Sequence, residues 1–304
     1  MPTLAAASML HDVRFRRFWA AQVISEAGSG VGAVAMPLTA VLTLGASAMD
    51  MGLLAAASTL PVVLLGLHAG VWIDRLPVRP ILVATNVGRG ALLALVPLAT
   101  VAGWLRIDVL WSIAFAVGVL AVVFDIAVTS YMPALVERGQ LVDANATLQA
   151  SGAAARVAGP GTGGWLVQAV GAPFAVTADA LSFVVAAALL TRLRVADDFS
   201  RPERRGVWTE IYEGMVTVWR DRILRVMVAS TTIGALGGSV QQAAYVLFAV
   251  REVEVSAPVL GTIVACGSLA GVAGAALAGR TARLLNAGGA MLSDNLQLRS
   301  VCWC

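Results

Sequence analysis

Among the ionisable side chains inside long apolar stretches of the sequence, where an uncompensated charge is costly, three are candidates for chemistry. Glu26 and Asp179 are carboxylic acids, and Arg156 is a guanidinium. A carboxylic acid in such a place can bind and release a proton, whereas an arginine can neutralise a carboxylate or hold an anionic group of a ligand. We therefore treat Glu26 and Asp179 as candidates for proton exchange. Glu26 could instead only hydrogen-bond a neighbouring helix, and the partner of Arg156 could be Glu26 or Asp125.

A second charged group lies in the loop sequence GVWIDRLPVR, which begins at Gly70 and ends at Arg79. Gly70 permits a close approach of two helices, and Asp74 can face the positive N-terminus of another helix. Arg75 or Arg79 could pair with Asp125, at the end of a later apolar stretch. The same charges could serve only to orient helices in a membrane.

The sequence GPGTGG runs from Gly159 to Gly164 within another apolar stretch. Pro160 removes one backbone donor and predicts a kink, and Gly159, Gly163 and Gly164 permit tight helix packing. Uncharged polar side chains in the apolar stretches could line a substrate cavity or only join helices. They are Gln22, Ser29, Gln149, Gln241, Gln242 and Tyr245.

The amino-acid composition indicates the environment of the structural elements that must position these groups. Hydrophobic residues make up 59% of the 304, charged residues 13%, and the mean hydropathy is +0.82. A soluble core of this size could not bury so much apolar surface, so the chain is predicted to be an all-α membrane protein. Eight continuous stretches are long enough to span a bilayer as helices. Their approximate limits are 18–44, 51–73, 81–103, 109–130, 147–169, 172–191, 224–249 and 257–278.

Basic residues indicate the orientation. All 21 are arginines, and all but three fall in or near segments on one side of the predicted membrane. Arg106 and Arg251 fall on the other side, and Arg299 lies in the tail. This asymmetry places the N-terminus in the cytoplasm. The net charge of +3 is thereby explained without nucleic acid as a partner. Two histidines and three scattered cysteines form no metal site or catalytic constellation, so we predict neither an enzyme nor a bound metal.

The spans divide into six, a long charged connection, and two. The predicted units are 1–195 (a six-helix bundle), 196–222 (a cytoplasmic linker), 223–285 (two helices of a second bundle) and 286–304 (a polar tail). Helical spacing of apolar side chains in the linker predicts an amphipathic helix on the membrane surface. This helix could have a regulatory role or could only link the two bundles. A faint repeat supports two related halves, because Ser47-Ala48 recurs as Ser256-Ala257.

Motifs in a fixed order give the chain a recognisable pattern. They are FRRFWAAQVISEAG at 15–28, the loop GVWIDRLPVR, FDIAVTSYMPALV at 124–136, NATLQASGAAARVAGPGTGG at 145–164 and DALSF at 179–183. With them the chain resembles the major facilitator superfamily, and within it the bacterial efflux branch of drug:proton antiporters and the enterobactin exporter. The resemblance implies a major facilitator fold in the inner membrane and a secondary transporter working by alternating access. It implies proton-coupled export of a small amphipathic, drug- or siderophore-like molecule, with no cofactor and the proton gradient as energy source.

The resemblance also implies roles for residues. In the superfamily the loop after the second span closes the cytoplasmic side as a latch. Here Pro77 replaces a usual glycine and Val78 a usual arginine, which leaves Arg79 or Arg75 to serve Asp125. GPGTGG resembles the antiporter motif associated with export, although it could reflect helix packing alone. DALSF could likewise be a packing motif.

A second substitution in the pattern concerns the first span. Relatives often carry an acid at the position of Ser29, and Glu26, one turn earlier, could replace it.

A carrier of this family has twelve spans, whereas eight are predicted here, and residues 286–304 are polar and aperiodic. The sequence therefore predicts a C-terminally truncated carrier. The alternatives are a membrane protein that does not transport, an assembly partner, or an eight-span unit completed as a homo-oligomer.

Overall fold

The computed structural model describes residues 11–65, 77–193, 216 and 219–282. Every regular element within them is helical. The long helices are α2 (Val13–Leu38), α3 (Ala48–Leu65), α5 (Val78–Val101), α6 (Ile107–Leu135), α7 (Leu141–Val170), α8 (Ala172–Thr191), α10 (Arg222–Arg251) and α11 (Ala257–Ala282). A π-helical turn, Thr39–Thr43, continues α2, and a 3-10 turn, Arg138–Gln140, precedes α7.

Each of the eight predicted spans corresponds to one of these helices, so the predicted all-α membrane fold is confirmed. Five helices, α3, α5, α6, α8 and α11, are long and apolar enough to cross a bilayer by length and composition. The remaining three, α2, α7 and α10, contain all the glutamines of the described α-helices. Most of the polar candidates named above therefore lie on the least apolar helices.

Serines and aspartates fix where helices begin. Asp12 caps α2, since its Oδ1 accepts a hydrogen bond from the backbone N–H of Arg14 at 2.8 Å. Ahead of α3, the Ser47 hydroxyl donates to Asp50 at 2.7 Å and accepts from the Asp50 backbone N–H at 3.2 Å. Ser256 directly precedes α11 in the same way that Ser47 precedes α3. The matched Ser-Ala pairs thus start the second helix of each predicted half.

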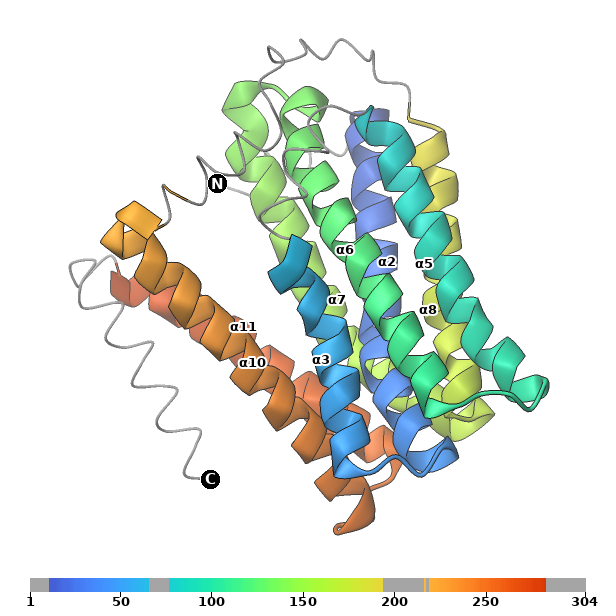
Figure 1. Cartoon of the computed structure of the whole chain (residues 1–304). Helices are drawn as coiled ribbons and strands as arrows, with labels where there is room; N and C mark the ends of the chain where they lie inside the picture. The colour runs from blue at the N-terminus through green and yellow to red at the C-terminus, as the bar shows by residue number, and fades with distance from the viewer. Residues whose placement is uncertain (1–10, 66–76, 194–215, 217–218, 283–304) are drawn as a thin grey trace.

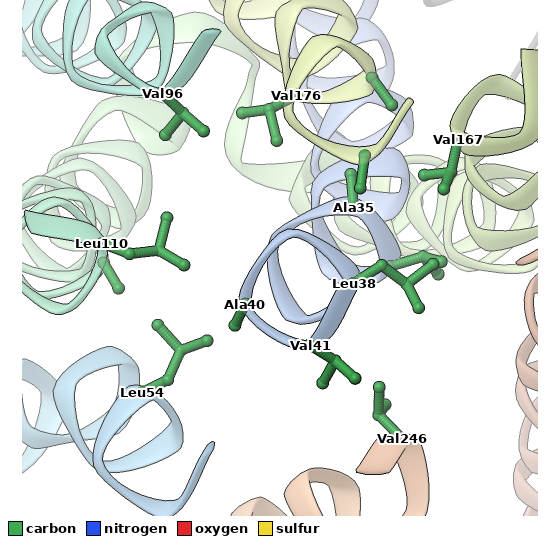
Figure 2. Close-up of a cluster of buried hydrophobic side chains, with 14 of the residues drawn as sticks. Ala35, Leu38, Ala40, Val41, Leu54, Val96, Leu110, Val167, Val176 and Val246 are labelled. Atoms are coloured by element: carbon green, nitrogen blue, oxygen red, sulfur yellow. The ribbon is translucent and has the colours of Figure 1, made fainter. Parts of the chain in front are cut away.

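The first six helices form a bundle (Figure 1) in which α2 packs against α7 and α8, α5 against α6 and α8, and α3 against α6. We name its two ends by residue: α2 begins at the Val13 end and finishes at the Gly45 end. Figure 2 shows the finish of α2, with Leu38, Ala40 and Val41, surrounded by side chains from the other helices. A second apolar cluster, which includes Phe15, Phe18, Leu82, Tyr131 and Leu190, fills the Val13 end.

Helices α10 and α11 join this bundle at the Gly45 end. Val246 and Ala249, late in α10, and Ala257 and Leu260, early in α11, are buried in the same cluster as the finish of α2. Ile223, at the other end of α10, is 69% exposed. Figure 1 shows both helices slanting away from the bundle toward the Val13 end. The six-helix bundle and the pair α10 and α11 therefore pack together at the Gly45 end and diverge at the Val13 end.

Several predicted features lie outside the described residues. They are Gly70, Asp74 and Arg75 of the loop after the second span, most of the linker with its predicted amphipathic helix, and the tail from 286.

Candidate functional site

A cavity of about 580 Å³ lies among α2, α3, α6 and α8, with Gly238 of α10 at one wall. Its lining is mostly apolar and includes Met36, Met51, Leu54, Val117 and Phe183. Hydroxyl groups come from Ser29, Ser58 and Thr59. Asp179 is the one ionisable side chain among its described lining residues. The cavity therefore combines an apolar surface with a single carboxyl group.

Asp179 is held at the contact between α8 and α2. It is 5% exposed, and within the described part of the chain its Oδ1 has no hydrogen-bond partner. Two glycines of α2 make room for α8. A Cβ atom on Gly32 would stand 2.1 Å from Oδ2 of Asp179, and one on Gly28 would stand 1.9 Å from Oγ of Ser182. Glycine within a helix costs about 1 kcal/mol relative to alanine, and here it admits a buried carboxylate.

Arg89 of α5 is a buried cation that the sequence analysis counted only toward helix orientation. It is 7% exposed, and its guanidinium carbon lies 4.8 Å from the ring centroid of Phe124 and 5.1 Å from that of Phe183. Its Nη2 donates to the carbonyl of Leu120 at 3.3 Å. Arg89 interacts electrostatically with Asp179, Asp125 and Glu26. Its position deep inside an apolar span was the signal that could have identified it.

Glu26 and Arg156 form an ion pair between α2 and α7, with Nη1 3.2 Å from Oε2. Both side chains are partly exposed, 41% for Glu26 and 52% for Arg156. They line a smaller cavity of about 120 Å³ together with Gln22 and Gln149. Of the two partners that the sequence left open for Arg156, the structure brings it to Glu26.

Helices α2 and α6 each contribute lining residues to both cavities. Gln22 and Glu26 line the small cavity, and Ser29 and Ala33, the next residues on the same helix face, line the large one. On α6, Gly118 lines the large cavity and Val128 the small one. Asp125 is seven residues from Gly118, two helical turns, and therefore lies on that face of α6. Its side chain is exposed.

Arg79 lies at the Val13 end, where its Nη2 donates to the carbonyl of Thr191 at the end of α8. Arg17 donates to the next carbonyl, that of Arg192, at 2.8 Å. Among the described residues no ion pair joins Arg79 to Asp125. Both arginines instead bind the terminal carbonyls of α8, which favour positive charge. The Arg79–Asp125 pair stays a prediction.

The GPGTGG segment packs α7 against two helices at once. Gly159 approaches Gly30 of α2, since a Cβ on Gly159 would stand 2.6 Å from the Cα of Gly30. Gly163 lies on the same side, against Val31 of α2.

The opposite side of the segment meets α11. A Cβ on Gly164 would stand 2.3 Å from the carbonyl oxygen of Ala257, and one on Gly261 would stand 2.4 Å from that of Pro160. Small residues at this spacing let helix backbones touch within a membrane.

Two polar candidates on α10, Gln241 and Tyr245, are not among the described lining residues of the large cavity. Gln241 is exposed, Tyr245 packs against the apolar cluster at the Gly45 end, and the side chain of Gln242 lies outside the description. Gly238, one turn before Gln241 and Gln242, is the α10 residue that lines the cavity.

Arg251 of α10 forms hydrogen bonds to the Gly45 end of the bundle. Its Nη2 donates to the carbonyls of Gly45 and Ala46, at 3.0 and 2.8 Å. Both carbonyls belong to the turn that joins α2 to α3, where Gly45 has a positive φ of 63°. The sequence analysis counted Arg251 only as one of two arginines on this side.

Comparison with known proteins gives the family. The family model described as Major Facilitator Superfamily matches residues 18–293, which is most of the chain. A search of curated proteins found no match. The matched region contains most of α2, the seven other long helices, both cavities and the buried charges described above. The chain belongs to the Major Facilitator Superfamily, whose members are multi-pass membrane proteins that act as secondary transporters and not as enzymes.

Proposed function

We propose that this transporter exports a small amphipathic molecule in exchange for protons, by alternating access, from the cytoplasmic membrane of a bacterium. Its N-terminus would be cytoplasmic, in accord with the arginine distribution. Export is favoured by the resemblance of the ordered motifs to the efflux branch. The described charges and cavities supply the chemistry.

The observation that carries the proposal is the 580 Å³ cavity with one buried carboxyl group. Its volume lies in the range of about 300–1,000 Å³ that is usual for small-molecule sites. Methionine, leucine and phenylalanine side chains favour the apolar part of an amphipathic substrate. Asp179 supplies a group that can exchange a proton at the same place.

Asp179 is a better candidate for proton exchange than Glu26. Glu26 has a guanidinium 3.2 Å away and is 41% exposed, so its charge is compensated and hydrated. Asp179 is buried at the wall of the larger cavity. We assign the exchanged proton to Asp179 and give Glu26 and Arg156 a supporting role in joining α2 to α7.

The closed Gly45 end fits a resting state that loads its substrate from the cytoplasm. With the Val13 end cytoplasmic, the splayed ends of α10 and α11 face the compartment from which an exporter takes its substrate. The other conformation would require α10 and α11 to separate from the bundle at the Gly45 end.

Proton flux in liposomes tests this function. The purified full chain would be reconstituted with a pH-sensitive dye inside, and a cationic, a neutral and an anionic amphiphile would be added in turn under a pH gradient. At least one amphiphile should drive proton movement that Asp179→Asn abolishes and Asp108→Asn, at an exposed surface pair, preserves. If none does so, or if wild type and Asp179→Asn behave alike, the chain is a membrane protein that does not perform this exchange.

A further inference from the structure

Three arginines meet at a cavity that the proposed exchange of protons and substrate does not use. This cavity of about 660 Å³ lies at the Val13 end and is lined by Arg17 of α2, Arg79 of α5, and Thr191 and Arg192 at the end of α8. We call it the arginine cavity. Every described lining side chain is polar, and none of them is acidic. Within the described part of the chain, no carboxylate forms an ion pair with these three arginines.

Backbone carbonyls hold two of the three guanidiniums in place. Nη1 of Arg17 donates to the carbonyl of Arg192 at 2.8 Å, and Nη2 of Arg79 donates to the carbonyl of Thr191. A guanidinium has five N–H groups, so a single bond to a carbonyl leaves other donors for a ligand. The side chain of Arg192 is exposed. The arginine cavity thus presents positioned donors to an anion with several acceptor oxygens, and phosphate is the anion that best matches arginine in this way.

The arginine cavity lies at the ends of two helices that are long and apolar enough to cross a bilayer, α5 and α8. Arg79 is the second residue of α5, and Arg192 directly follows the last residue of α8. A helix of about twenty residues is as long as the hydrocarbon core is thick, so the ends of such helices lie near the lipid headgroups. Phospholipid phosphates are the anions concentrated at that depth.

An apolar stripe on α8 leads from the membrane interior to this cavity. Leu181 is 58% exposed, Val184 is 52% exposed, and Ala188 is exposed as well. Their spacing of three and four residues puts them on one face of the helix, and Thr191 and Arg192 continue that face. A lipid whose phosphate occupies the arginine cavity can therefore lay an acyl chain along α8.

We propose that the arginine cavity binds the phosphate of an anionic phospholipid, with an acyl chain along the exposed face of α8. Arg17, Arg79 and Arg192 donate to the phosphate oxygens. A headgroup that also carries an ammonium group fits less well, because its positive charge would meet three arginines and, among the described lining residues, no carboxylate. The bound lipid would connect α2, α5 and the end of α8, and it would stabilise the folded bundle by mass action.

Two lipids with the same acyl chains and different headgroups test this inference. Dioleoyl phosphatidylglycerol, dioleoyl phosphatidylcholine and inorganic phosphate would each be titrated into the purified full chain in a nonionic detergent, and bound molecules counted by native mass spectrometry. Wild type should bind phosphatidylglycerol at least about tenfold more tightly than either of the other two. Phosphatidylglycerol should also raise the unfolding temperature more than phosphatidylcholine does.

Two arginine variants locate the binding. Arg192→Gln should weaken phosphatidylglycerol binding about fivefold, since that is roughly the contribution of one arginine near an anionic membrane surface. Arg16→Gln is the matched control, because Arg16 is an exposed arginine at the same end and is not among the described lining residues. It removes the same charge and should change the affinity by less than about twofold.

The outcomes decide the inference separately from the proposed export. Equal binding of the two lipids, or equal losses in Arg192→Gln and Arg16→Gln, would overturn the lipid site. Inorganic phosphate that binds as tightly as phosphatidylglycerol would indicate a site for a free anion and would also overturn it. The comparison of lipids uses the wild-type chain alone, so it holds even if a variant does not fold. The titrations require no transport, so either proposal can fail while the other stands.

Discussion

Asp179 of α8 occupies the space where a side chain on Gly32 of α2 would stand. A Cβ atom added to Gly32 would lie 2.1 Å from Oδ2 and 3.0 Å from Cγ of Asp179. Real Cβ atoms do not approach other atoms this closely, so glycine at 32 is a condition for the observed position of the carboxylate. Two helices thus determine together where the single acid of the cavity lies.

Gly32→Ala should displace Asp179 and impair proton exchange while the chain still folds. We expect a loss of about 1–3 kcal/mol in the free energy of unfolding, because the inserted methyl group overpacks the α2–α8 contact. Gly52→Ala is the matched control, since a Cβ there meets no atom within 4 Å. Thermal unfolding in detergent and proton flux in liposomes measure both effects. Flux that is equal in the two alanine variants would contradict the assigned role of Gly32.

Arg89 and Asp179 should be energetically coupled. Arg89→Met removes the buried cation and leaves two carboxylates without it, so the single variant should be strongly destabilised. Asp179→Asn in the same chain should recover part of that loss. A double-mutant cycle from unfolding midpoints should give a coupling energy of about 0.5–3 kcal/mol. Strict additivity of the two substitutions would show that Arg89 and Asp179 are not energetically coupled.

Helix positions could be predicted because each span is a continuous apolar run bounded by charged or capping residues. The Glu26–Arg156 pair was one of two open alternatives, since sequence does not say which faces of α2 and α7 meet. Ser29 lines the large cavity, whereas Gln241 is exposed and is not among the described lining residues of either cavity. A role of either residue in substrate binding stays a prediction.

Two features depended on how the helices pack. Asp179 fits against α2 at the cavity wall because Gly28 and Gly32 face α8, a contact between residues about 150 positions apart. Arg89 was missed because it was counted only toward helix orientation, although it lies inside the predicted span 81–103. In the structure its helix begins at Val78, which places Arg89 well inside.

The contact between α7 and α11 predicts a disulfide. A Cβ on Gly161 would lie 3.8 Å from the Cβ of Ala265, which is the usual separation in a disulfide. Gly161→Cys with Ala265→Cys should cross-link on oxidation in a chain whose three native cysteines are replaced by serine. Gly164→Ala should reduce the yield, because its Cβ would stand 2.3 Å from a backbone oxygen that cannot turn away. Mass change after partial proteolysis measures the cross-link.

The control pair for that experiment is Gly161→Cys with Gly271→Cys, since nothing lies within 4 Å of a Cβ on Gly271. Equal yields from the two cysteine pairs would mean that α11 does not lie against α7 as described.

Arg251 and Arg106 both lie at the Gly45 end, and their substitution should have different effects on the separation of α10 from the bundle there. Arg251 donates to the carbonyls of Gly45 and Ala46, whereas Arg106 pairs with the exposed carboxylate of Asp108 at 3.1 Å. Hydrogen bonds from a charged donor contribute about 1.5–3 kcal/mol, and exposed ion pairs about 0–1 kcal/mol. Arg251→Gln should therefore shift the equilibrium toward separation of α10 from the bundle at this end, and Arg106→Gln should not.

Thiol labelling can follow that separation at a buried position. Val246, 3% exposed on α10, would be changed to cysteine in the cysteine-free chain and treated with a membrane-impermeant maleimide in intact cells. With the Gly45 end facing outward, Arg251→Gln should raise the labelling rate at least about tenfold, and Arg106→Gln should leave it near that of the parent. Equal rates in the two variants would show that the Arg251 bonds do not hold this end closed. Because closure here and splaying at the Val13 end belong to one conformation, faster labelling should also be accompanied by weaker loading of substrate from the cytoplasmic side.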